Sequence, residues 1–343
     1  MSAMSMYSSI DGLAGSWHMV HLGSRAVGGA GLVVAECTAV TPEGRITPGD
    51  LGLWSDAHVD ALRPVTEFIS EQGSVPAIQL SHAGRKGGRQ IPWISRDPLP
   101  VSEWGRLIAP SELAFTEGWQ VPREASEADI AKLVDNFAAS AAMAVDAGFK
   151  AVELHVAHGY LLHQFLSPIA NQRTDAYGGS LEARATVPRL VARAVRAAIP
   201  EGMPLLVRLT IRDWLDGGIT TEDTRQTMEW LCEDGVDLID CSSGAIAPGE
   251  NLPLAPGYHS SFTRQLRAAT KMKVGVVGLI TEPEQAEALL QDEAADMIFI
   301  ARQFLRDPYW PRRAAIALAS ENDAPIPIQY RRSIATPGKL TQW

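Results

Sequence analysis

The sequence predicts an α/β fold of the (β/α)8 class, the TIM barrel, and two observations support this prediction. Short apolar runs, typical of buried strands, alternate with helical patterns along nearly the whole chain. Eight such strand-and-helix units fit into the 343 residues, and eight is the number that the barrel requires. Because periodicity does not tell how a sheet closes, a doubly wound sheet remains the alternative.

The elements follow in chain order from apolar spacing, from capping residues such as Ser126 and from turn glycines. The predicted strands span residues 1–6, 32–36, 75–80, 151–155, 205–210, 238–241, 274–277 and 297–300. The predicted helices span residues 17–28, 56–72, 127–147, 181–199, 222–234, 261–270, 282–290 and 308–319. Gly73, Gly148 and Gly235 each stand directly before an apolar run, as glycines between a helix and the next strand do. All elements fit one domain, 1–343.

Composition and charge narrow the class of protein. A hydrophobic fraction of 46% with 20% charged residues is that of an ordinary globular chain, and no apolar run approaches the ~20 residues of a membrane helix. The net charge of −10, without a basic cluster, argues against a nucleic-acid partner. No signal-peptide pattern opens the sequence, and the three cysteines form no CxxC motif. We therefore expect a cytoplasmic protein that binds neither membranes nor nucleic acid.

In a barrel, functional residues lie at the C-terminal ends of the strands. Polar or small residues follow every predicted strand of this chain. In order these are Ser5, Met6 and Tyr7; Cys37 and Thr38; Gln79, His82, Arg85 and Lys86; His155, His158 and Tyr160; Arg208 and Arg212; Ser242, Ser243 and Gly244; Gly278; and Ala301 and Arg302. This is the composition of a ligand-binding barrel mouth.

The stretch 155–180 carries the most specific signal. His155, His158 and Tyr160 fall within six residues at a strand end, and two imidazoles with a phenol can hold an oxyanion and deliver a proton. A lone histidine at such a position is more often a satisfied polar residue. The pair could also begin a metal site, but zinc needs a third ligand and none stands nearby in the sequence.

Two small-residue turns near the C-terminus suggest a phosphate site. Gly278 follows the seventh predicted strand, and Ala301 and Arg302 follow the eighth, each ahead of a helix. In barrels these two loops frequently bind phosphate through backbone N–H groups, and an arginine adds charge-assisted hydrogen bonds. Together with the histidines they indicate a phosphorylated cofactor lying across the barrel mouth.

Two segments depart from a minimal barrel. Residues 86–126, a long loop after the third strand, contain prolines and tryptophans, and loops of this length in compact domains usually form lids or binding surfaces. The tail 320–343 contains Pro325 and Pro327, which exclude a helix there, so we expect it to lie extended over the body or over a partner subunit.

The chain resembles the old yellow enzyme family of FMN-dependent ene-reductases, most closely the bacterial branch of thermophilic-like and xenobiotic reductases. The whole stretch 155–180 matches the family signature in register, including the histidine pair, the tyrosine and the segment RTDAYGGS. Further matches extend over essentially the whole chain. They are residues 4–9, 36–40, 44–47, 79–86 and 240–244, and Arg302 with residues 305–308.

The resemblance implies a TIM barrel that holds FMN non-covalently. NADPH or NADH would reduce the FMN, which would pass hydride to the β-carbon of an activated alkene. His155 and His158 would bind the carbonyl or nitro oxygen of this substrate, and Tyr160 would protonate its α-carbon.

The resemblance also assigns further site residues. Gln79 and Arg208 would contact the isoalloxazine ring. Other positions that match the family's FMN contacts are Ala3, Met4, Ser5, Cys37, Ser243, Gly278, Ala301 and Arg302. Tyr7 and Lys86 would line the substrate pocket. Arg332 matches an arginine that reaches the active site of a neighbouring subunit, which implies a homodimer or homotetramer.

Three departures from the family pattern affect these expectations. Ser5 stands where the branch often has a cysteine, so the flavin potential should differ, and Ala301 stands where a glycine is common. The chain also starts inside the first predicted strand, whereas family members carry a hairpin and more of that strand before it. We therefore expect a shortened first strand, and we hypothesise that Met1 is an internal methionine of a longer natural protein or that the sequence has been trimmed.

Two alternatives to the ene-reductase remain open at this stage. One is a flavin-binding barrel that is inert or impaired because its first strand is incomplete. The other is a metal-dependent barrel hydrolase that uses His155 and His158. The dienoyl-CoA reductase relatives, with an iron–sulfur cluster and an added domain, do not fit three dispersed cysteines in a chain of this length.

Overall fold

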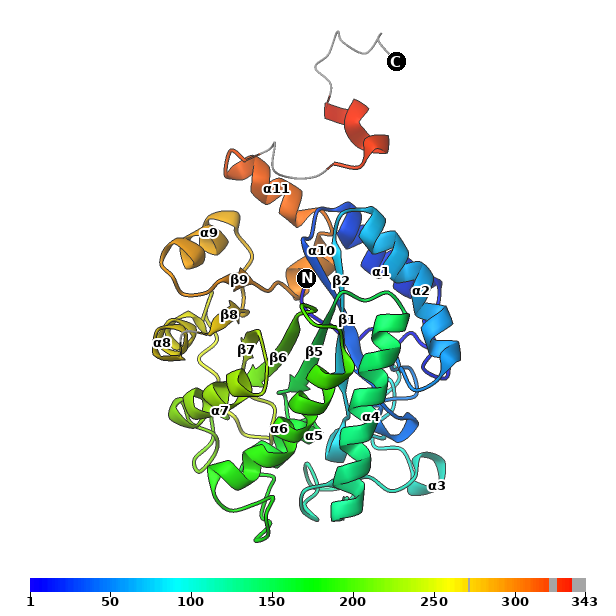
Figure 1. The fold of residues 1–343 in the computed structure, drawn as a ribbon, viewed down its shortest axis with the longest axis vertical. Coiled ribbons are helices and arrows are strands. Elements are labelled where there is room, and N and C mark those ends of the chain that lie inside the picture. Colours follow the sequence, from blue (N-terminus) through cyan, green and yellow to red (C-terminus); the bar gives the residue numbers. More distant parts are fainter. Residues whose placement is uncertain (271, 321–325, 335–343) are drawn as a thin grey trace.

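A computed structural model describes residues 1–270, 272–320 and 326–334. Its centre is a sheet of seven parallel strands, in which each strand is hydrogen-bonded to the next strand of the sheet along the chain (Figure 1). Two further short strands form a separate sheet. The seven are β1 (Leu32–Ala39), β2 (Val75–Ser81), β5 (Ala151–Val156), β6 (Leu205–Thr210), β7 (Leu238–Ser242), β8 (Lys273–Val276) and β9 (Met297–Ile298). This curled parallel sheet, covered by helices, confirms the barrel class and seven of the eight predicted strands.

The first predicted strand, residues 1–6, is not a regular strand. Only its first two residues join the sheet: the amino group of Met1 donates to the carbonyl of Leu32 at 2.6 Å, and Ser2 N–H donates to the carbonyl of Ile300 at 2.9 Å. Val34 N–H in turn donates to the Met1 carbonyl at 3.2 Å. Met1 and Ser2 therefore bridge the gap between β1 and the segment after β9, and the following residues leave the ladder.

Helices follow the strands and cover the outside of the sheet (Figure 1). The principal ones are α1 (Ser16–Val27), α2 (Asp56–Glu71), α4 (Glu127–Asp146), α6 (Leu181–Ala198), α7 (Thr221–Glu233), α8 (Ser260–Thr270) and α9 (Pro283–Gln291). They agree with the predicted helices to within a residue or two. Ser126 caps α4 as predicted, since its hydroxyl accepts from Asp129 N–H at 3.2 Å. The last predicted helix, 308–319, corresponds to α11 (Trp310–Ala317), and a short helix that was not predicted, α10 (Arg302–Arg306), precedes it.

The long loop 86–126 contains short elements of its own. These are η2 (Gly84–Lys86), whose last residue begins the loop, α3 (Val101–Trp104), and the two-residue strands β3 (Ile108–Ala109) and β4 (Arg123–Glu124). Arg173 anchors the loop by donating to the carbonyls of Pro110 and Ala125. In the tail, Ile328–Ile334 forms a 3₁₀ helix, η4, where an extended chain was expected; Pro327 precedes its first residue and so does not interrupt it. Residues 321–325 and 335–343 lie outside the described part.

Alternation along the strands divides the barrel interior into layers. One layer is a small apolar cluster. It contains one residue from each of β1, β2, β5, β6 and β7, together with Phe299; the five strand residues are Val34, Ala77, Ala151, Leu206 and Leu238. Two residues further along each strand stand Glu36, Gln79, Glu153, Arg208 and Asp240, all buried. The next residues in register, such as His155 and Ser242, reach the strand ends. The charged layer therefore lies directly beneath the barrel mouth.

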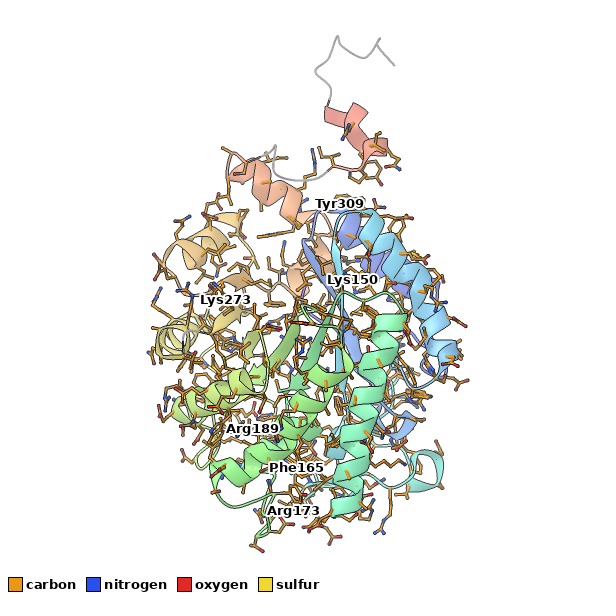
Figure 2. The ribbon with its side chains drawn as sticks, in the orientation of Figure 1. Lys150, Phe165, Arg173, Arg189, Lys273 and Tyr309 are labelled. Atoms are coloured by element: carbon orange, nitrogen blue, oxygen red, sulfur yellow. The ribbon has the colours of Figure 1, made fainter. Side chains whose placement is uncertain are left out.

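Figure 2 allows the two ends of the barrel to be told apart. Lys150 and Lys273 mark the N-terminal ends of β5 and β8, whereas Phe165 and Arg173 lie near the C-terminal ends of the strands. The long loop and the turn after β5 both belong to the latter end.

Candidate functional site at the barrel mouth

A tight turn after β5 carries the predicted catalytic residues. His158 and Gly159 both adopt positive φ, 57° and 71°, before Tyr160 begins the short helix α5 (Leu161–Leu166). Position 159 requires glycine, because a Cβ atom there would collide with the carbonyl oxygen of Ala245. The strand end and this turn together bring His155, His158 and Tyr160 to one place, as the sequence predicts.

The two histidines face each other. Nε2 of His155 lies 3.3 Å from Nδ1 of His158, and the rings stand nearly perpendicular at 88°. On its other side, Nε2 of His158 lies 2.7 Å from the hydroxyl of Ser242 at the end of β7. Burial, and next the charge of Arg208, hold the pKa of both imidazoles well below the usual value, so both rings are neutral at pH 7.

Tyr160 lies beside the histidine pair. Its ring centroid is 4.9 Å from that of His155, and the ring packs against Cys37, Ile46 and Ala83. Burial raises the pKa of its phenol well above the usual value, with smaller contributions from Cys37 and Tyr7, so the phenol keeps its proton at neutral pH.

Lys86 approaches the same turn from the end of β2. Its ammonium donates to the carbonyls of His158, at 2.8 Å, and of Ala245, at 2.9 Å. The nitrogen also lies 5.2 Å from the centroid of the Tyr160 ring and 4.7 Å from that of Phe115 in the long loop. Burial lowers the pKa of Lys86 to about 7. The structure thus places Lys86 where the sequence predicts, and adds Phe115.

The charged layer beneath the mouth holds the side chains predicted to contact the isoalloxazine ring. Gln79 Nε2 donates to Glu153 Oε1 at 2.7 Å, so the amide oxygen of Gln79 is left free for another donor. Arg208 lies between Asp240, with Nε 3.3 Å from Oδ2, and the Ser2 hydroxyl, which accepts from Nη1 at 2.7 Å. Sequence reasoning missed Glu153 and Asp240, although each stands two residues before a mouth residue on its strand.

The predicted phosphate end is a cavity of about 270 Å³ at the ends of β7, β8 and β9. Its lining includes four residues predicted to bind the cofactor: Arg208, Gly278, Ala301 and Arg302. Tyr258 and Arg306 also line it and were not predicted. Gly278 has a φ of 132°, and a Cβ atom there would lie 2.8 Å from the ring of Tyr258. The cavity joins three cationic side chains to backbone positions suited to close contact with an anion.

Ser243, also predicted to bind the cofactor, is held by a histidine that sequence reasoning missed. Nδ1 of His259 lies 2.6 Å from the carbonyl of Val277, which can only accept, so Nδ1 carries the proton. Nε2 of His259 must then accept from the Ser243 hydroxyl at 2.7 Å. Because this hydroxyl proton is already used, Ser243 can donate to an anion only through its backbone N–H.

The segment after Ser2 runs along the mouth. Met6 N–H donates to Glu36 Oε2 at 2.8 Å, and Ala3 and Met4 pack against the apolar clusters. Tyr7, with φ of 49°, makes an edge contact with Trp93 of the long loop at 6.0 Å. Ser5 lies between Met4 and Met6 in this segment. Arg332 belongs to η4, which follows α11 in the chain.

Among the described residues, no group of three histidine, cysteine or acidic side chains has the arrangement of a metal site. The helices of the same residues include none that is long and apolar enough to cross a membrane.

The fold and the mouth define an α/β barrel enzyme of the kind that binds a phosphorylated cofactor across its strand ends. Residues 1–321 match the model of the NADH:flavin oxidoreductase / NADH oxidase family. The chain is 44% identical to the NADPH dehydrogenase of Bacillus subtilis (strain 168) over 334 residues, which are 97% of this chain and 93% of that protein. The NADPH dehydrogenase of Halalkalibacterium halodurans is 42% identical over 335 residues, again 97% of this chain and 93% of the relative. The chain therefore belongs to the NADH:flavin oxidoreductase / NADH oxidase family.

Solved structures agree with this assignment. Morphinone reductase superposes with a TM-score of 0.77 at 27% identity, covering 92% of this chain and 85% of that one. The old yellow enzyme homologue from Zymomonas mobilis superposes with a TM-score of 0.73 at 25% identity, covering 91% and 86%. The protein is an NAD(P)H-dependent flavin oxidoreductase of the old yellow enzyme type, with FMN as its cofactor. This confirms the resemblance seen in the sequence and removes the basis for a metal-dependent hydrolase.

Proposed function

We propose that the protein reduces the C=C bond of α,β-unsaturated carbonyl or nitro compounds, with electrons from NADPH or NADH. The observation that carries the proposal is the pair of ring nitrogens, His155 Nε2 and His158 Nδ1, that face each other across 3.3 Å beside Tyr160. Two hydrogen-bond donors and one proton donor are what the polarisation and protonation of such an alkene require.

The described residues fit FMN. The cavity of about 270 Å³ offers the Gly278 backbone and Arg302 to its phosphate, and a Cβ at 278 would fill the cradle. The free amide oxygen of Gln79 and the cation of Arg208 lie beneath the mouth for its ring. The remaining proposed contacts are Ala3, Met4, Ser5, Cys37, Ser243 and Ala301. When bound at these residues, FMN would supply the hydride transfer, from the nicotinamide cofactor to the β-carbon of the alkene.

The two histidines bind the substrate oxygen. In this proposal the Ser242 hydroxyl donates to Nε2 of His158, which leaves the proton of this neutral ring on Nδ1. Without substrate, that Nδ1–H donates to Nε2 of His155 at 3.3 Å, so the proton of His155 is on its own Nδ1. When the substrate oxygen lies between the two rings, His155 takes the tautomer with its proton on Nε2. Both N–H groups then donate to the one oxygen, and they stabilise the enolate-like charge that develops on it as the β-carbon is reduced.

Tyr160 protonates the α-carbon. Its raised pKa keeps the phenol protonated until the substrate becomes basic. The phenolate that remains lies beside the ammonium of Lys86, whose nitrogen is 5.2 Å from the ring centroid. Solvent then returns the proton to Tyr160. Lys86 and Tyr7 also line the substrate pocket.

The oligomer is part of the proposal. η4 lies away from the strand ends of its own chain, so Arg332 serves the pocket of a second copy in a homodimer or homotetramer (Figure 1). Light scattering coupled to size-exclusion chromatography tests the assembly. We further propose that the protein works in the cytoplasm.

A spectroscopic titration tests the activity. Anaerobic NADPH should bleach the flavin absorbance of the holoenzyme, and a cyclic enone such as 2-cyclohexenone should restore it with formation of the saturated ketone. Tyr160→Phe should leave the bleaching step intact and slow the enone step by on the order of 100-fold. A holoenzyme that is bleached by NADPH but recovers its colour only with oxygen would contradict the proposed activity.

A further inference from the structure

The backbone of the turn after β5 is held by side chains on every side. His158 N–H donates to Thr210 Oγ1 of β6 at 3.2 Å, and Gly159 N–H donates to Nδ1 of His163 at 2.8 Å. The carbonyl of Gly159 accepts from Gln164 Nε2 at 2.7 Å. With the bond from Lys86 to the carbonyl of His158, no backbone polar group at these two positive-φ residues is left to solvent. The turn is therefore held in a conformation that the backbone alone disfavours.

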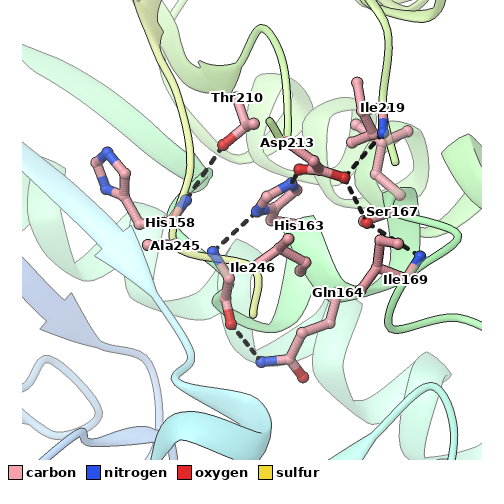
Figure 3. Close-up of polar contacts among 12 residues, drawn as sticks. His158, His163, Gln164, Ser167, Ile169, Thr210, Asp213, Ile219, Ala245 and Ile246 are labelled. Atoms are coloured by element: carbon pink, nitrogen blue, oxygen red, sulfur yellow. Dashed lines mark hydrogen bonds and ion pairs between the residues drawn. The ribbon is translucent and has the colours of Figure 1, made fainter. Parts of the chain in front are cut away.

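His163 is the link between this turn and a carboxylate on the neighbouring unit. Its Nε2 lies 2.9 Å from Oδ1 of Asp213, and neither side chain is accessible to solvent (Figure 3). Because Nδ1 accepts from the Gly159 N–H, the ring proton must be on Nε2, where the carboxylate accepts it. Asp213 therefore selects the tautomer of His163 that can hold Gly159.

Asp213 is itself fully engaged. Its Oδ2 accepts from the Ser167 hydroxyl at 2.7 Å and from the Ile219 N–H at 2.8 Å (Figure 3). Burial alone would raise the pKa of Asp213, but His163 and these donors outweigh it and lower the pKa. The carboxylate thus stays charged in a site closed to water, 46 residues from one partner and 50 from the other.

We propose that Asp213 and His163 are positioning residues of the active site, which act through the backbone of Gly159 to aim His158 and Tyr160 at the substrate. The inference rests on the proposed function of those two side chains. A buried hydrogen bond between a carboxylate and an imidazole that served stability alone would not need to end on the backbone of the one turn that carries the donors.

The substitution Asp213→Asn tests the inference because it nearly preserves shape but cannot accept from His163, Ser167 and Ile219 together. If the amide oxygen takes the place of Oδ2, it accepts from Ser167 and Ile219, and the NH2 group then faces Nε2 of His163. That orientation forces the ring proton to Nδ1, where it opposes the Gly159 N–H. In the reverse orientation the amide oxygen accepts from His163, and the NH2 group takes the place of Oδ2. The Ile219 N–H then has no acceptor, so that only the bond between this position and the Ser167 hydroxyl can remain.

The matched control is Asp234→Asn. Asp234 is also a buried carboxylate in ion pairs, with Arg189 at 2.7 Å and Arg193 at 2.8 Å, but it lies between α6 and α7 and touches no residue of the turn. A general loss of stability would appear in both variants. Only a loss of positioning would be confined to Asp213→Asn.

The holoenzymes should be compared in three measurements. Asp213→Asn should retain FMN and its bleaching by NADPH, but kcat for enone reduction should fall about 10- to 100-fold, as expected for donors displaced by a fraction of an ångström. Reoxidation of the reduced flavin by oxygen, which needs neither His158 nor Tyr160, should keep its rate. Hydrogen–deuterium exchange of the peptide that contains Gly159 should accelerate in this variant and not in the control.

Two outcomes would overturn the inference. One is an Asp213→Asn holoenzyme with wild-type enone reduction and wild-type exchange at Gly159, while Tyr160→Phe remains impaired. The other is an equal loss in Asp234→Asn, which would show a general effect of buried charge. If Tyr160→Phe itself reduces enones at the wild-type rate, it is the proposed function that fails. If the Asp213→Asn chain does not fold, His163→Gln replaces it in the test, because glutamine offers both an acceptor and a donor. The inference then requires that His163→Gln retain more enone reduction than His163→Leu.

Discussion

The hydroxyl of Ser242 lies 2.7 Å from Nε2 of His158, so the end of β7 contacts the histidine that follows β5. In a buried, neutral imidazole, a hydroxyl that donates to one ring nitrogen leaves the proton on the other. We propose that Ser242 donates here, so that Nδ1 of His158, the nitrogen that faces His155, becomes a donor toward the substrate.

Removal of this contact should weaken enone reduction. In Ser242→Ala the proton of His158 is free to occupy either nitrogen, and kcat/KM for the enone should fall about tenfold, the cost of one hydrogen bond of about 1.4 kcal/mol. The control is Ser74→Ala, which removes a buried hydroxyl bonded to the Ala30 carbonyl at 2.6 Å at the opposite end of the barrel. Steady-state kinetics with matched FMN content measure the effect, and equal kcat/KM values in the two variants would refute it.

Glu153 should make stability depend on pH. Burial, and next Asp240, raise its pKa from 4.5 to about 8 in the folded protein. Below pH 4.5 the carboxyl is protonated in both states and contributes nothing; between pH 4.5 and 8 only the unfolded state ionises. The free energy of unfolding therefore falls as pH rises through this window, by up to about 1.4 kcal/mol per unit from this group.

Glu153→Gln removes this pH dependence of stability, and its amide oxygen can still accept from Nε2 of Gln79. The melting temperature of the variant should exceed that of the wild type at pH 8 and approach it at pH 4.5. Glu201→Gln, on the exposed surface, should follow the wild type throughout. Thermal melts in a series of buffers decide the matter: a Glu153→Gln curve parallel to that of the wild type would show that the buried carboxyl is not the cause.

The parts of the site that a sequence can predict are those within one strand end. His155, His158 and Tyr160 fall in a single short stretch, and Gly278, Ala301 and Arg302 follow strands that apolar runs make visible. Their joint placement at the mouth required only the barrel topology, in which all C-terminal strand ends meet.

Two of the residues that escaped prediction, His259 and Asp213, depend on contacts between distant parts of the chain. His259 lies 16 residues from Ser243, and Asp213 lies 50 from His163, so no local pattern connects them. The first strand is shortened, as expected, but its extent could not be predicted: apolar composition predicts a buried segment, whereas only Met1 and Ser2 of residues 1–6 have backbone partners in the sheet. Hydrogen-bond partners of that kind are properties of tertiary packing.

Lys86 should impose an alkaline limit on turnover. Burial, and next Arg89, lower its pKa to about 7, so it is charged below pH 7 and neutral above. As the charge is lost, the phenolate left on Tyr160 loses its neighbouring cation, and kcat for the enone should fall between pH 6 and 8. Lys86→Met should be about tenfold slower at pH 6, a loss of roughly 1.4 kcal/mol, and nearly independent of pH. The exposed Lys150→Met serves as control; a Lys86→Met profile that keeps the wild-type decline would assign the limb to another group.

Gly278 should be required for cofactor retention. Its φ of 132° and the ring of Tyr258, 2.8 Å from where an added Cβ would lie, make Gly278→Ala both strained and overcrowded beside the proposed phosphate site. Gly249 has a φ of 90° with no atom within 4 Å of the corresponding position, so Gly249→Ala carries the backbone strain without the collision. We expect Gly278→Ala to bind FMN at least about tenfold more weakly, because the collision displaces the backbone N–H from the phosphate and a hydrogen bond to a charged group contributes about 1.5–3 kcal/mol. The Kd of FMN, measured by quenching of its fluorescence, should stay near the wild-type value in Gly249→Ala. Equal Kd values for the two variants would place the phosphate elsewhere.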